Sequence, residues 1–156
     1  ATPYQTAFAD SEGARIHYQR WGDAAKPGLL LVHGNGAHAH WWDFIAPFLT
    51  DDYHVVAMTF SGMGDSDWRD SYLMDGFARE MMAVCEHAGL FAHVEKPIVI
   101  AHSFGGFVTI VAGADFGDRR ARDVLDEQHR VRVAHRGDRE LDAPAREVDG
   151  VGRRGP

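Results

Sequence analysis

The chain has 156 residues, of which 45% are hydrophobic, 11% aromatic and 25% charged, so it contains enough apolar residues for a folded core. The formal net charge of −7 disfavours nucleic acid and anionic membranes as partners, and the single cysteine, Cys85, excludes a disulfide framework and a cysteine-based zinc site. We find neither an apolar run of about 18 residues nor a signal-peptide pattern at the N-terminus. We therefore expect a cytoplasmic location by default.

The first part of the chain predicts a hairpin followed by two buried strands. Residues 4–10 predict a short strand, and the alternation of polar and apolar residues in 15–20 predicts its partner. The apolar segments 29–32 and 54–60 predict strands that are buried on both faces of a parallel sheet. Between these two strands, the spacing of apolar residues in 41–49 predicts a helix.

The following segments continue this alternation. Residues 73–88 predict the longest helix, 97–101 a third buried strand, and 107–114 a helix that begins after the turn at 102–106. A hairpin followed by alternating strands and helices predicts an α/β fold with a doubly wound, mainly parallel sheet. Functional groups are then expected at the carboxyl ends of the strands.

The composition changes after Phe116, the last aromatic residue. Residues 1–116 carry 6 Lys and Arg against 14 Asp and Glu, whereas residues 117–156 carry 10 Arg, no Lys and 9 Asp and Glu. We interpret 1–116 as the N-terminal part of a folded domain and 117–156 as an Arg-rich, aromatic-free tail that is disordered or non-native. Three explanations stay open for the tail: a solvated interaction segment, a piece of a domain that continues elsewhere, or a GC-rich gene translated in a shifted frame.

Ser103 lies in a tight turn that follows the third buried strand. A serine hydroxyl is a weak nucleophile, which must be exposed and close to a base. A sharp turn from strand to helix holds it above the sheet and requires small residues two positions before and after it, here Ala101 and Gly105. The backbone N–H of Phe104 would then face a developing oxyanion. We predict Ser103 as the nucleophile; the alternative is that it only caps the following helix.

Three motifs occur in order: LLLVHGNG at 29–36, FSGMGDSD at 60–67 and IVIAHSFGG at 98–106. In these motifs the part before the tail resembles the serine-nucleophile branch of the α/β-hydrolase fold family. The resemblance implies an incomplete α/β-hydrolase core with an irregular C-terminal tail. The chain departs from the common pattern at Ala101, where glycine is usual, and at Thr59, where many members carry aspartate.

A glycine-rich segment follows the first buried strand. Glycines allow backbone N–H groups to approach a substrate oxygen closely. The resemblance implies that Asn35 supplies a second oxyanion donor beside Phe104; the alternative is an ordinary Asn-Gly turn. The resemblance implies a supporting role for the remaining motif residues: His33, Gly34, Gly36, Ala101, His102 and Gly105.

The resemblance also implies the chemistry. Relatives that break carbon–halogen bonds or open epoxides use an aspartate nucleophile, so Ser103 favours esters, thioesters, lactones or carbon–carbon diketones. We expect a serine hydrolase that acts on a small-molecule acyl substrate through an acyl-enzyme, with no cofactor, nucleic-acid or membrane partner. The alternatives are a carbon–carbon lyase, a catalytically inactive truncated or frame-shifted fragment, and a binding module.

A serine hydrolase also needs a histidine base and an acid that orients it. In this family both follow the serine in the sequence. The histidines after Ser103 are His129 and His135, which have no convincing strand-and-loop context. We therefore assign neither the base nor the acid, and the sequence indicates no oligomeric state.

Histidines and aromatic residues gather after the first buried strand. His33, His38 and His40 have no carboxylate or cysteine at a recognised ligand spacing, so we expect no metal site. Trp41 and Trp42 follow directly, and we expect them either to line an apolar pocket or to pack in the core.

Overall fold

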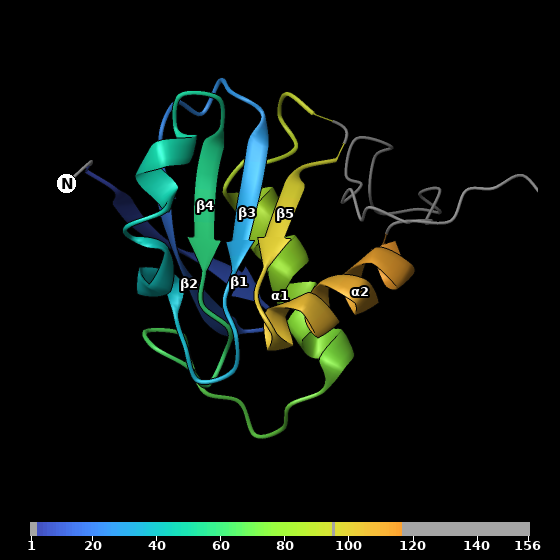
Figure 1. Ribbon diagram of the computed structural model, residues 1–156. Coiled ribbons are helices and arrows are strands. Elements are labelled where there is room, and N and C mark those ends of the chain that lie inside the picture. The colour runs from blue at the N-terminus through green and yellow to red at the C-terminus, as the bar shows by residue number, and fades with distance from the viewer. Residues whose placement is uncertain (1–2, 95, 117–156) are drawn as a thin grey trace, which may run out of the picture.

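The computed structural model describes residues 3–94 and 96–116, which form a mixed five-stranded sheet with helices on both faces (Figure 1). The strand order is β1-β2-β4-β3-β5. The strands are β1 (Gln5–Ser11), β2 (Ala14–Trp21), β3 (Gly28–Val32), β4 (His54–Met58) and β5 (Ile98–Ala101). The helices are the 3₁₀ helices η1 (Ala39–Trp42) and η2 (Ala46–Leu49) and the α-helices α1 (Met74–His87) and α2 (Phe104–Phe116).

Strands β3, β4 and β5 run parallel, so their carboxyl ends meet at one end of the sheet (Figure 1). Leu31 of β3 is in register with Ala57 of β4 and with Ile100 of β5. The hairpin β1–β2 is antiparallel, and β2 joins β4 in the antiparallel sense. The prediction of an α/β fold is confirmed, and the location of functional groups at the carboxyl ends of the strands stays a prediction.

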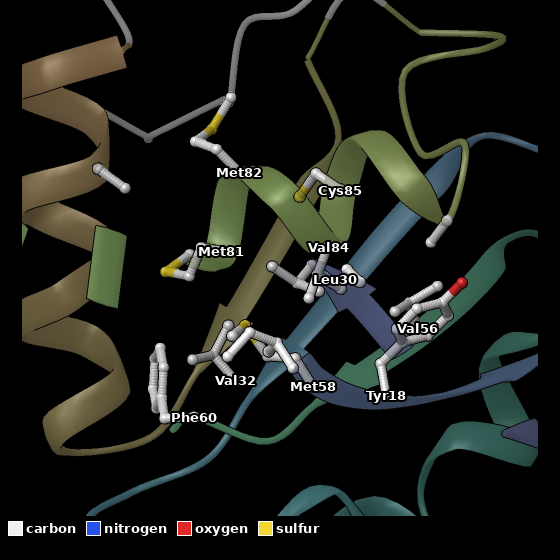
Figure 2. Packing of buried hydrophobic residues seen from close by; sticks show 14 of the residues in the cluster. Tyr18, Leu30, Val32, Val56, Met58, Phe60, Met81, Met82, Val84 and Cys85 are labelled. Atoms are coloured by element: carbon white, nitrogen blue, oxygen red, sulfur yellow. The ribbon is translucent and has the colours of Figure 1, made fainter. Parts of the chain in front are cut away.

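One face of the sheet is covered by α1 and α2. Successive side chains of a strand point to opposite faces, and Leu30 and Val56 point to this one. Figure 2 shows Val84 of α1 close to Leu30, and Met81 of the same helix belongs to this core as well. Cys85 of α1 is completely buried in the same core, and this burial raises the pKa of its thiol to about 12. The thiol is therefore protonated at neutral pH and serves as a packing group.

The opposite face is covered by η1 and η2, which pack Trp42 and Ala46 against Leu31 and Val55. The prediction of one helix over 41–49 is wrong, because the segment forms two short 3₁₀ helices instead. The physical reason is Pro47, which has no N–H to donate within a continuous helix and stands near the start of η2.

Strand β4 ends two residues earlier than the predicted strand 54–60. The Thr59 N–H donates to His17 O at 2.9 Å, and the Phe60 N–H donates to His33 Nε2 at 3.1 Å. These donors leave the ladder between β3 and β4 and fix the loops at the functional end of the sheet.

Two further predictions concern the chain as a whole. No helix within residues 3–94 and 96–116 has both the length and the hydropathy of a membrane span. The tail 117–156 and its interpretation as disordered or non-native lie outside the described residues.

Candidate active site

Ser103 occupies the turn between β5 and α2, at the carboxyl end of the parallel strands (Figure 1). It is exposed, and no described group forms a hydrogen bond with its Oγ. Its backbone φ of 51° lies in the left-handed region, which residues other than glycine rarely adopt. Such a conformation persists only where the surrounding structure enforces it, and it concentrates at functional sites.

Close contacts between the serine turn and the end of β3 enforce this conformation. The His102 N–H donates to Val32 O at 2.9 Å, and the Gly105 N–H donates to His102 O at 3.0 Å. A Cβ atom at Gly105 would lie 2.5 Å from the backbone oxygen of His33. Only glycine at position 105 allows α2 to start this close to the loop after β3.

Phe104 is the first residue of α2, so its N–H has no acceptor within the helix. Its ring packs edge-on against Phe60 and Phe77, with ring centroids 5.7 and 5.2 Å away. The core therefore holds the Phe104 side chain in place, and the Phe104 N–H lies at the serine turn. The positive end of the helix dipole adds to the attraction for an anion at this point.

His33 holds the loop after β3 in place. Its ring is completely buried, and its Nε2 accepts the Phe60 N–H at 3.1 Å. The imidazole therefore carries its proton on Nδ1, which donates to Gly34 O at 2.7 Å. Burial lowers the pKa of His33, and the hydrogen bond with Gly34 opposes this shift. A neutral imidazole with both nitrogens engaged supports the loop and is not a free base.

The hydrogen bonds of Gly34 O set the direction of the Asn35 N–H. Gly34 O accepts from His33 Nδ1 and from the Ala37 N–H at 3.2 Å. In a trans peptide the C=O and the N–H point in opposite directions, so the Asn35 N–H points away from these partners. It has no hydrogen-bond partner among the described residues, and Asn35 is exposed.

The loop after β3 touches the serine turn directly. A Cβ atom at Gly34 would lie 2.7 Å from His102 Nδ1 and 3.4 Å from Ser103 Cβ. The Trp41 ring stacks on the His102 imidazole, with ring centroids 5.8 Å apart and an angle of 20° between the planes. Trp41 is half exposed at the mouth of the site, whereas Trp42 is buried in the core.

Two of the predicted supporting residues have simpler surroundings. Ala101 is half-buried at the end of β5 and is in register with Val32. Gly36 is exposed, with a positive φ of 70° at the tip of the loop. The structure thus brings all the predicted site residues to one end of the sheet, while their roles stay predictions.

A sequence profile of the alpha/beta hydrolase family matches residues 29–154. The chain belongs to this family. Epoxide hydrolase 4 of Mus musculus is 29% identical over 99 residues, which cover 62% of this chain and 26% of that protein. Lipase LipV of Mycobacterium tuberculosis is 29% identical over 111 residues, which cover 70% of this chain and 40% of that protein.

The fold of the chain also matches solved structures. A membrane phospholipase A aligns with a TM-score of 0.64 and 29% identity, over 71% of this chain and 35% of that one. The chain spans about a quarter to two fifths of the length of these proteins. The comparisons therefore establish the family of the chain and the fold of its described part.

The loop 60–67 depends on an acidic residue that the sequence analysis missed. Glu80 of α1 is buried, and its carboxylate accepts the Ser61 N–H at 3.0 Å and pairs with Arg69 Nε at 2.8 Å. The sequence signal that could have indicated this role is the position of Glu80, which lies with Phe77 and Met81 on the apolar side of the helix. Such a position indicates a buried carboxylate that needs a partner.

The described part of the chain contains no group of three His, Cys, Asp or Glu side chains that could hold a metal ion. It also contains no histidine bonded to Ser103 Oγ. His129 and His135, the two histidines that follow Ser103, lie outside the described residues. The base and the acid of a triad therefore stay unassigned.

Proposed function

We propose that this alpha/beta hydrolase is a serine hydrolase that cleaves an ester or a related acyl bond of a small molecule through an acyl-enzyme. The observation that carries the proposal is the exposed Ser103 with a φ of 51° at the turn from β5 to α2. This strained turn lies beside two backbone N–H groups, of Asn35 and Phe104, that have no other acceptor among the described residues.

The reaction follows from these three groups. Ser103 Oγ attacks the carbonyl carbon of the substrate and gives its proton to a base. The carbonyl oxygen becomes an oxyanion, which accepts hydrogen bonds from the N–H groups of Asn35 and Phe104. Collapse of the tetrahedral intermediate breaks the bond to the leaving group, which takes up the proton. Water then hydrolyses the acyl-enzyme by the same steps and frees Ser103.

The serine itself argues for acyl transfer and against epoxide opening. A carboxylate that opens an epoxide forms an ester, whose carbonyl carbon water can attack in a second step. A serine that opened an epoxide would form an ether, which has no carbonyl carbon and would trap the enzyme. The similarity to a lipase and to a phospholipase A agrees with ester chemistry.

The test is covalent labelling of the full chain with an alkyl fluorophosphonate. Phosphonylation of a serine needs an oxyanion hole. With a weak base the reaction is slow but still proceeds, because the oxyanion hole accelerates it even when the catalytic base is missing. We expect one adduct per chain in the intact mass spectrum. Peptide mapping should place the adduct on Ser103.

Two variants control this experiment. Ser103→Ala should abolish the adduct, while Ser71→Ala, at an exposed serine away from the turn, should leave it unchanged. Circular dichroism checks that each sample is folded. A folded chain that stays unlabelled, or one labelled elsewhere, contradicts the proposal and leaves the inactive fragment or the binding module as its explanation.

A further inference from the structure

A cluster of histidines lies behind the site, on the sheet face that η1 covers. His17 of β2 is only 3% exposed. Its ring stacks on that of His40 at 6.4 Å, and the ring of His38 lies edge-on to His40 at 5.5 Å. These three rings join the hairpin β1–β2 to the segment 38–40, which follows the loop after β3.

Thr59, at the end of β4, is the centre of the hydrogen bonds in this cluster. Its Oγ1 accepts the N–H of Ala39, the first residue of η1, at 2.9 Å. The same oxygen lies 3.3 Å from His17 Nδ1. A neutral Nδ1 can accept the Thr59 O–H, so the hydroxyl bridges His17 and the start of η1.

The position of η1 matters to the site because η1 carries Trp41. The Trp41 ring stacks on His102, the residue before Ser103. The chain of contacts therefore runs from His17 through Thr59 and η1 to the mouth of the serine turn. None of these contacts depends on whether Ser103 is a nucleophile.

The surroundings of His17 make a positive charge on its ring unfavourable. The side facing β1 is covered by the uncharged ring of Phe8, at 5.4 Å. Burial lowers the pKa of His17; Asp65 opposes this shift, and His40 and His38 add to it. The titratable and charged groups around the cluster are Asp65 in the loop after β4, His38, His40 and Asp43 in the η1 segment, and Arg15, which lies over Phe8.

We propose that His17, Thr59 and His40 form an acid-sensitive latch, which holds η1 on the sheet at neutral pH and releases it when His17 takes up a proton. A proton on Nδ1 removes the acceptor of the Thr59 O–H and makes Nδ1 a donor toward Thr59 Oγ1, the same oxygen that accepts the Ala39 N–H. It also places a buried positive charge beside His40, whose electrostatic interaction with His17 disfavours that charge. The released segment takes Trp41 away from His102.

The direction of the pH effect follows from proton linkage. The closed form disfavours charged His17, so the open form binds the proton more readily. The closed form is therefore fully favoured above the ordinary histidine pKa of 6.5 and loses stability as the pH falls below it. Acid opens the latch and alkali leaves it closed.

The latch can be followed by ¹⁹F NMR of the full chain labelled with 5-fluorotryptophan, with Trp41 assigned through Trp41→Phe. Between about pH 7 and about pH 5 we expect the Trp41 resonance to move toward that of exposed tryptophan. The methionine methyl resonances of Met58 and Met81, which are buried on the other face of the sheet, should stay dispersed. Their persistence separates release of η1 from global unfolding.

Three variants make the test decisive. His17→Gln cannot take up the proton, so the Trp41 transition should disappear. His40→Gln removes one of the groups that lower the pKa of His17, so the closed form tolerates the proton better and the midpoint should move to lower pH, which gives a second reading if His17→Gln does not fold. His93→Gln, at an exposed histidine outside the cluster, should change nothing. A Trp41 resonance that does not respond to pH, or a response that survives in a folded His17→Gln, overturns the proposal.

Discussion

A single buried side chain, His33, sets the direction of the Asn35 N–H through Gly34 O. We predict that His33→Ala slows phosphonylation of Ser103 about 100-fold, the typical effect of losing one oxyanion donor. The variant also leaves the buried Phe60 N–H without an acceptor, which costs about 1–3 kcal/mol of stability. Labelling rates measured with the folded variant, beside His93→Ala as a control, check this. An unchanged rate in folded His33→Ala would show that the loop does not need this hydrogen bond.

At the scale of residues, the sequence predicts groups that are close together along the chain better than groups that are far apart. Ser103, Phe104 and Gly105 are neighbours, and the turn that joins them follows from their order and size. The contact between His17 and Thr59 joins positions 42 residues apart. Nothing in the local pattern indicates it, because it depends on which strands become neighbours in the sheet.

At the scale of elements, the attachment of α1 to the loop 60–67 rests on Glu80. Glu80→Ala removes the acceptor of the Ser61 N–H and leaves Arg69 without its buried partner. We predict a loss of about 3 kcal/mol in the free energy of unfolding. The matched control is Glu86→Ala, at an exposed position of the same helix, which should change it by less than about 0.5 kcal/mol. Urea denaturation measures both, and equal midpoints would contradict the assignment of Glu80 as an anchor.

Apolar periodicity predicts that a helix or strand exists better than it predicts the residues at which the element begins and ends. Each of the predicted strands is found, because apolar runs and alternation reflect how strands pack. The prediction that the strand at 97–101 is buried is wrong, since β5 lies at the edge of the described sheet and exposes Ile98 and Ile100. The predicted helix 107–114 begins earlier, at Phe104, because the serine turn forces Gly105 and Gly106 into its first turn despite their low helix propensity. Strand β4 ends before Phe60 because the Phe60 N–H donates to the His33 side chain and not to a neighbouring strand.

At the scale of the whole molecule, β5 lies at the edge of the described sheet and exposes apolar side chains. Ile98 and Ile100 of β5, and Phe107 and Ile110 of α2, are between 38% and 66% exposed. Exposed strand edges and apolar patches favour association. We predict that the average mass of the full chain rises with concentration in sedimentation equilibrium.

Charge on α2 should suppress this association. The double variant Phe107→Asp with Ile110→Asp is expected to lower the average mass, since it places two like charges on the exposed apolar side of the helix. Phe48→Asp, on the exposed surface of η2, should have no such effect. A wild-type chain that stays monomeric at high concentration would refute the prediction.

The burial of Cys85 has a practical consequence for experiments on this protein. The chain has one cysteine, and it lies inside the core between α1 and the sheet with a thiol that stays protonated at neutral pH. Thiol-directed spin labels and fluorophores react with accessible thiolates. A cysteine introduced at a chosen surface position can therefore be modified selectively in the native chain, and the wild-type background needs no prior removal of its own thiol.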